Sequence, residues 1–129
     1  MSKVVELTKE NFSEIIDGND IVIVDFWAPW CGPCKSFAPT FETAAEKNKG
    51  IVFAKVNTED EQALGGMFQI RSIPTLMVFK EQIVVFSQAG AMPASGLDEL
   101  LTNANELDMK MVREEIAAKE EAEKATGTA

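Results

Sequence analysis

The stretch FWAPWCGPCKSFAP, from Phe26 to Pro39, contains both cysteines of this 129-residue chain. The continuous apolar run from Ile21 to Trp27 leads into it and predicts a strand that is covered on both faces. An amphipathic pattern follows and predicts a helix that begins near Pro33, because proline is tolerated in a first helical turn. We therefore expect Cys31 and Cys34 at a junction between a strand and a helix.

The residue composition narrows what such a pair can do. The chain has no histidine, which excludes Ser-His-Asp and Cys-His nucleophilic catalysis. Lys35 follows Cys34 where attachment of a c-type haem needs histidine. Two cysteines fall short of the four ligands of a closed zinc site, which only a second chain could complete. A structural disulfide across so short a loop would restrict little chain entropy, so a redox pair is favoured.

The net charge limits the partners that we expect. Twenty-one acidic and twelve basic side chains give a net charge of −9, which disfavours nucleic acid and anionic membrane surfaces. No run approaches eighteen apolar residues, so we expect no membrane span. The start of the chain, MSKVVELTKENF, lacks the apolar stretch of a secretory signal, and we expect a cytoplasmic protein.

The alternation of the remaining segments predicts the fold class. Apolar runs typical of buried strands alternate with amphipathic segments, in the order βαβαβαββα, which indicates an α/β domain with a mixed sheet. Glu81 and Gln82 stand at the turn of the last hairpin, although neither suits the usual tight turns. The predicted strands are Val4–Val5, Ile21–Trp27, Ile51–Asn57, Thr75–Lys80 and Ile83–Gln88, and the predicted helices are Thr8–Gly18, Pro33–Gly50, Glu59–Phe68 and Ala94–Leu107.

The last segment, residues 108–129, differs in character from residues 1–107. Its apolar residues Met109, Val112 and Ile116 form a short helical stripe among many charges. We expect a helical extension with a frayed end. Docking of a partner, packing on the domain and simple fraying all fit the stripe.

Four spaced motifs resemble the thioredoxin family over residues 3–107. WCGPCK stands at Trp30–Lys35, DFWA at Asp25–Ala28, SIPT at Ser72–Thr75 and AGA at Ala89–Ala91. The resemblance implies a thioredoxin fold, with a central mixed five-stranded sheet flanked by helices. It also implies a dithiol–disulfide oxidoreductase that reduces disulfides of client proteins.

The resemblance assigns a role to each cysteine. Cys31 attacks the client disulfide, and Cys34 resolves the mixed disulfide. A helix N-terminus favours a thiolate at Cys31. Gly32 and Pro33 shape the motif, and they stand where oxidising or isomerising relatives commonly carry a histidine. Their presence favours a reductant.

Asp25 interrupts an apolar run, where a carboxylate is costly unless it is paired or protonated. One interpretation is an edge residue that faces water. The resemblance instead implies a buried proton acceptor for Cys34, with Lys55 as its charge partner.

The resemblance also implies a substrate surface around a cis-proline, whereas an ordinary X-Pro bond is trans. In this interpretation the turn at Pro74 exposes the backbone of Ile73 to an extended client segment. Trp27 packs beneath the active-site loop. The implied surface consists of Trp30, Ile73, Pro74, Gly90 and Ala91.

We expect no bound metal, because the chain offers only two cysteines and no histidine, and no bound nucleotide cofactor, because it has no glycine-rich nucleotide motif. The resemblance implies that a flavoprotein thioredoxin reductase supplies electrons from NADPH, and we expect a monomer. The alternative function is a binding module, in which the redox domain grips partners without catalysis and the C-terminal helix docks to an assembly.

Overall fold

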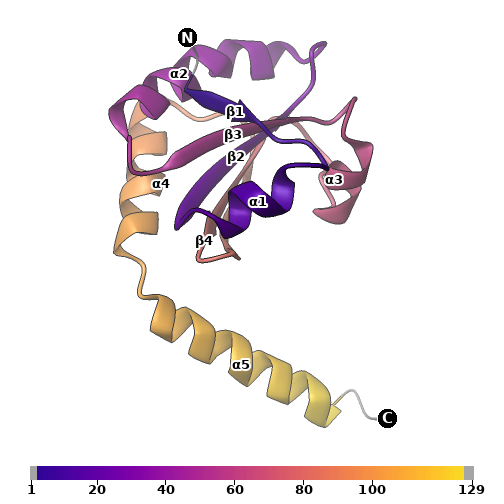
Figure 1. Cartoon of the computed structure of the whole chain (residues 1–129), viewed down its shortest axis with the longest axis vertical. Coiled ribbons are helices and arrows are strands. Elements are labelled where there is room, and N and C mark those ends of the chain that lie inside the picture. Colours follow the sequence, from indigo (N-terminus) through magenta and orange to yellow (C-terminus); the bar gives the residue numbers. More distant parts are fainter. Residues whose placement is uncertain (1–2, 127–129) are drawn as a thin grey trace.

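The computed structural model describes residues 3–126, with side chains through Glu123. Five strands form one sheet in the order β1-β3-β2-β4-β5 (Figure 1). β1, β3 and β2 run parallel, whereas β4 is antiparallel to β2 and β5 is antiparallel to β4. The predicted mixed sheet is confirmed. The strands are β1 Val4–Glu6, β2 Ile21–Trp27, β3 Val52–Asn57, β4 Thr75–Lys80 and β5 Ile83–Ala89.

Helices cover both faces of the sheet. Phe41 of α2 and Leu97 of α4 pack with Ile23 on one face. On the opposite face, Ile16 of α1 packs with Val24. The alternation of side chains along a strand thus directs apolar residues of β2 into two separate cores, as the unbroken apolar run predicted. The helices are α1 Phe12–Asp17, α2 Gly32–Lys47, α3 Gln62–Met67, α4 Ala94–Glu106 and α5 Met109–Thr126.

Three predicted helix limits are wrong. α3 begins at Gln62, three residues after the expected start at Glu59. Thr8 is not the N-cap of α1; its carbonyl accepts a hydrogen bond from the backbone N–H of Phe12 (2.9 Å), and Asn11 occupies the N-cap position. At the end of α2, Asn48 stops the helix two residues before Gly50. The side-chain amide of Asn48 donates to the Ala44 carbonyl (2.8 Å), so a polar side chain ends the helix in place of a glycine.

The hairpin turn forms with residues that are unusual for it. Glu81 and Gln82 have φ angles of 50° and 72°, the left-handed backbone that tight hairpin turns need. The backbone N–H of Glu81 donates to the Asp20 carbonyl (2.8 Å), and its carboxylate forms an ion pair with Arg113. Contacts from outside the hairpin therefore hold the turn.

The C-terminal extension is helical, as predicted, and its first turn is attached to the domain. Met109 is buried, and Arg113 reaches Glu81 on the β4–β5 turn. The buried Lys80 ammonium donates to the carbonyls of Ala104, Asn105 and Leu107, which satisfies the end of α4 just before α5 begins.

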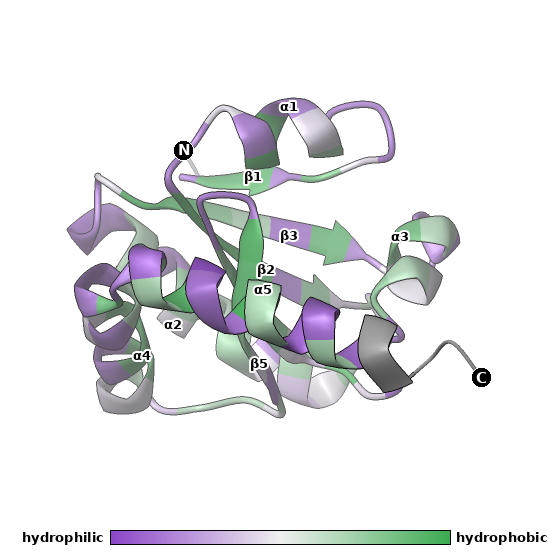
Figure 2. Ribbon diagram, turned by 90° about the horizontal axis from the view of Figure 1, so that it is seen from below, coloured by the Kyte–Doolittle hydropathy of each residue, from purple (hydrophilic) through white to green (hydrophobic). Residues whose placement is uncertain are grey.

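Beyond this attachment, α5 leads away from the sheet (Figure 1). Hydrophobic bands alternate with hydrophilic ones along α5 (Figure 2). The expected frayed end at residues 127–129 lies outside the described part of the chain. None of the described helices combines the length and the apolar character that crossing a membrane requires.

Candidate redox site

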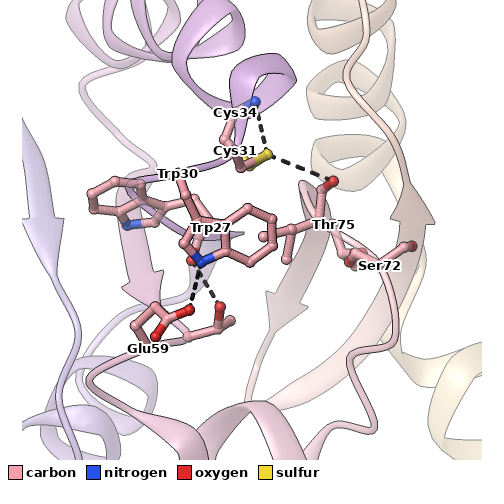
Figure 3. Close-up of a disulfide and its surroundings, with 9 residues drawn as sticks. Trp27, Trp30, Cys31, Cys34, Glu59, Ser72 and Thr75 are labelled. Atoms are coloured by element: carbon pink, nitrogen blue, oxygen red, sulfur yellow. Dashed lines mark hydrogen bonds between the residues drawn. A yellow bond between two sulfur atoms is a disulfide. The ribbon is translucent and has the colours of Figure 1, made fainter.

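The two cysteines lie at the junction of β2 and α2, as the sequence predicts, and are joined by a disulfide bond (Figure 3). Cys31 is the N-cap of α2, and its Sγ accepts a hydrogen bond from the backbone N–H of Cys34 (3.2 Å). Gly32 and Pro33 form the first two helical positions, one residue earlier than we expected. Cys31 therefore lies where free backbone N–H groups and the helix dipole favour a thiolate.

The loop that precedes β4 meets Cys31. The Ile73–Pro74 peptide bond is cis, which confirms the cis-proline that the family resemblance implied. The Ile73 carbonyl oxygen lies 3.8 Å from Cys31 Sγ. The backbone N–H of Gly90 donates to the Pro74 carbonyl (2.7 Å), and Gly90 has a φ of 93°, which favours glycine. The Ile73–Pro74 turn thus lies against the cysteine pair and is itself held by Gly90.

The residues of the predicted substrate surface differ in how far they are exposed to solvent. Trp30 is 68% exposed, Ala91 is exposed, and Ile73 and Gly90 are half-buried. Pro74 is fully buried, so it shapes the turn from within and is not part of the accessible surface.

Glu59 is a residue of this site that the sequence did not indicate. The indole N–H of Trp30 donates to its carboxylate (Figure 3). The two residues are 29 positions apart, and no motif connects them.

A small cavity of about 100 Å³ connects Asp25 with the redox pair. Asp25, Trp27, Cys34 and Lys55 are among the residues that line it. Asp25 is only 5% exposed and lies on the central strand β2, so the interpretation as a water-facing edge residue is wrong. Asp25 Oδ1 and the indole N–H of Trp27 are buried without a hydrogen-bond partner among the described residues.

The electrostatics of this cavity affect Asp25 in two opposite ways. Burial raises the pKa of the Asp25 carboxyl from 3.8 to about 7, although the nearby positive charge of Lys55 lowers it. The Lys55 ammonium lies 5.2 Å from the centre of the Trp27 ring, which is within cation–π range. A carboxyl with a pKa close to neutral can both accept and return a proton.

The comparisons with known proteins agree with this geometry. The thioredoxin family model matches residues 3–103. The chain belongs to the thioredoxin family. It is therefore a protein dithiol–disulfide oxidoreductase, with Cys31 and Cys34 as its redox-active pair.

Two related sequences show how far the similarity extends. A Streptomyces coelicolor relative assigned as thioredoxin 2 is 50% identical over 117 residues, which cover 91% of this chain and 87% of the relative. Because 117 residues exceed the 107 that precede Asp108, that match includes residues of the last segment, 108–129. Haemophilus influenzae thioredoxin is 42% identical over 99 residues, covering 75% of this chain and 92% of the relative.

Solved structures of thioredoxins have the same fold. A mutant thioredoxin from Halobacterium salinarum superposes with a TM-score of 0.76 at 29% identity, covering 83% of this chain and 96% of its own. Plasmodium falciparum thioredoxin gives a TM-score of 0.73 at 37% identity, covering 78% of this chain and 98% of its own.

The described side chains of this thioredoxin-family protein include no group of three or more His, Cys, Asp or Glu that could hold a metal ion.

A second cavity, of about 520 Å³, opens beside the redox pair, and no pattern in the sequence indicated it. Trp30 and Ile73 line it together with Gly65 and Gly66 of α3 and Gln69 of the following loop. We call it the α3 groove.

Proposed function

We propose that this protein reduces disulfides of client proteins, with Cys31 as the nucleophile and Cys34 as the resolving thiol. The position of Cys31 as the N-cap of α2 is the observation that carries the proposal. The Cys31 thiolate attacks one sulfur of the client disulfide. The new Cys31–client disulfide forms as the client S–S bond breaks, and the second client sulfur leaves as a thiolate that takes up a proton.

Asp25 acts in the second step. Its carboxylate accepts the proton of the Cys34 thiol through the cavity that both residues line. The Cys34 thiolate then attacks Cys31, which forms the Cys31–Cys34 disulfide and releases the remaining client sulfur as a thiolate. In total, two electrons pass from the cysteine pair to the client; the first client thiolate takes its proton from water, and the proton held by Asp25 is available for the second client thiolate. Lys55 is the charge partner that limits the rise of the Asp25 pKa.

The client segment binds beside the cis-proline turn. The backbone of Ile73, adjacent to Cys31, pairs with an extended client chain, and Pro74 fixes the turn from inside. Trp30, Gly90 and Ala91 complete the surface. Gly32 and Pro33 start the helix without adding a charged side chain near the cysteines, and Trp27 supports the loop.

Electrons reach the pair from NADPH through a flavoprotein thioredoxin reductase, and the protein itself binds no cofactor. We further propose a monomer that works in the cytoplasm, where thiols are kept reduced. In this proposal residues 1–107 form the redox domain and residues 108–129 an extension. The alternative function, a binding module, is favoured only by the extension of α5 away from the sheet and by Met111, which is 58% exposed.

Trapping of mixed disulfides tests the two cysteine roles. Cys34→Ser should retain client proteins as covalent adducts that dithiothreitol releases, and Cys31→Ser should retain none. Adducts with Cys31→Ser alone would reverse the assignment.

The equilibrium potential of the pair tests the direction of electron flow. We expect about −270 mV, the value typical of thioredoxin, from titration in dithiothreitol buffers followed by tryptophan fluorescence. A value above about −200 mV would show an oxidase or isomerase.

A further inference from the structure

One end of the α3 groove lies at Trp30 and Ile73, close to the place where Cys31 must meet the client disulfide. Trp30 and Ile73 line the groove, and the Ile73 carbonyl oxygen is 3.8 Å from Cys31 Sγ. A client chain that pairs with the Ile73 backbone therefore places a side chain next to its reactive cysteine at the mouth of this groove.

Two glycines in the last turn of α3 leave one wall of the groove bare. Gly65 and Gly66 both lie within the helix Gln62–Met67, where glycine is less favourable than alanine. A Cβ at Gly66 would meet no atom within 4 Å, and a Cβ at Gly65 would meet only the Thr58 side chain at an ordinary 3.8 Å. Neither the packing nor the backbone conformation requires glycine at these positions.

Gln69, three residues after Gly66, departs from local sequence preference in the opposite direction. Gln69 has a φ of 54°, in the left-handed region that favours glycine, yet it carries a long side chain. Its backbone N–H donates to the Gly66 carbonyl (3.1 Å), so the strained residue is directly connected to the glycine pair. The chain thus has glycine where the backbone does not need it, and a side chain where the backbone favours glycine.

All three of these residues line the same groove. Departures from local sequence preference are expected where function opposes stability. Neither the packing nor the backbone explains the two glycines, and the property that they share is the space that they leave in the α3 groove, which extends to Trp30 and Ile73.

We propose that Gly65 and Gly66 determine client specificity by keeping the α3 groove open for a large apolar side chain next to the attacked cysteine. Trp30, Ile70 and Ile73 supply the apolar contacts for such a side chain. This inference rests on the proposed function, because it takes Cys31 as the attacking sulfur.

Two synthetic disulfide peptides test the proposal. The peptides are identical except that each cysteine is followed by phenylalanine in one and by glycine in the other. Single-turnover reduction by the pre-reduced protein, followed by tryptophan fluorescence, gives a rate constant for each. We expect the wild-type protein to prefer the phenylalanine peptide.

A methyl group added to the wall of the groove should remove this preference. Gly66→Ala should lower the rate with the phenylalanine peptide about tenfold and leave the glycine peptide unchanged. Gly65→Ala should act in the same direction. Both variants should raise the thermal midpoint of unfolding, because alanine stabilises a helix relative to glycine.

Gly50→Ala is the matched control. It also adds one methyl group where no atom lies within 4 Å, but away from the groove, and should change neither rate. An equal loss with both peptides in Gly66→Ala, or no loss with either, would overturn the proposal.

Failure of the proposed function gives a different result. In that case Cys31→Ser would still form a mixed disulfide with the peptides through Cys34, or the wild-type protein would reduce neither. Either result overturns the groove proposal together with the assignment of Cys31.

Discussion

Asp25 and Lys55 are register partners on the neighbouring strands β2 and β3, and both line the cavity that reaches Cys34. The carboxyl lies in the middle of the sheet, where burial favours its protonated form. The lysine lies close enough to oppose that effect. The balance of the two keeps the pKa of Asp25 at about 7, near the pH at which a proton acceptor is most useful.

The first prediction concerns the pH dependence of stability. The folded-state pKa of Asp25 is raised from 3.8 to about 7, so the stability that protonation gives is present at low pH and is lost as pH rises through this range. The full loss is about 4 kcal/mol at most, at about 1.4 kcal/mol for each pKa unit. Asp25→Asn removes the ionisable group and should therefore stabilise the oxidised protein at pH 8 by a few kcal/mol, and not at pH 4.

Urea unfolding of the wild-type and variant proteins at both pH values measures this difference. Asp17→Asn is the control, because Asp17 is exposed on α1 and should give no such difference. A gain from Asp25→Asn that is equal at pH 4 and pH 8 would show that ionisation is not its cause.

The second prediction concerns the pH dependence of client release. Resolution of a pre-formed mixed disulfide should depend on a group with a pKa of about 7, and Asp25→Asn should slow this step more than it slows the initial attack. Lys55→Met keeps the apolar stem but removes the charge that lowers the Asp25 pKa, so the midpoint of the profile should move to higher pH. Stopped-flow fluorescence of the two steps separates them. An unchanged midpoint in Lys55→Met would show that Lys55 does not act on Asp25.

The third prediction concerns the hydrogen bond between Trp30 and Glu59. The indole ring is 68% exposed, and the Glu59 carboxylate is the acceptor of its N–H group. Glu59→Ala should leave the ring free to rotate, which lowers the fluorescence anisotropy of Trp30 in a Trp27→Phe background. It should also reduce kcat/KM for a protein disulfide by about two- to fivefold, since one hydrogen bond contributes about 1 kcal/mol.

Glu59→Gln is the matched control, because its amide oxygen can still accept the indole N–H. It should keep both the anisotropy and the rate close to those of the parent protein. Equal losses in the two variants would attribute the effect to the charge of Glu59 and not to the hydrogen bond.

The fourth prediction separates the attached first turn of α5 from the rest of that helix. A chain that ends at Arg113 keeps the buried Met109 and the ion pair to Glu81, so its stability and its protein-disulfide reduction should stay unchanged. A chain that ends at Leu107 loses Met109 and should be destabilised by about 2 kcal/mol or more. Thermal and urea unfolding compare the two. Loss of turnover in the chain that ends at Arg113 would show that the part of α5 after Arg113 contributes to catalysis.

The local pattern was sufficient to predict the elements and their order. The unbroken run from Ile21 to Trp27 favoured a strand covered on both faces, and the period of Phe37, Phe41 and Ala44 favoured a helix with one buried side. These patterns operate over a few residues, so the sequence contains them completely. The same patterns predicted that Cys31 and Cys34 lie at the junction between this strand and this helix.

Helix ends were less predictable, because they depend on single side chains. Asn11 and Asn48 took the positions that we expected for Thr8 and Gly50. Several residue types can satisfy the free backbone groups at a helix end, and their competition is decided by the surroundings.

The parts of the site that depend on distant segments could not be predicted from local patterns; the family resemblance implied the roles of Lys55 and Ile73, and the tertiary structure produces their contacts. The pairing of β2 with β3 placed Lys55 beside Asp25, and the packing of the α3–β4 loop brought Ile73 to Cys31. The α3 groove and the contact from Glu59 to Trp30 arise in the same way. The sequence determined the redox pair and the elements that carry it, because those depend on neighbours along the chain. The folded structure decided which charges and surfaces surround the pair, because burial and proximity exist only after the sheet has formed.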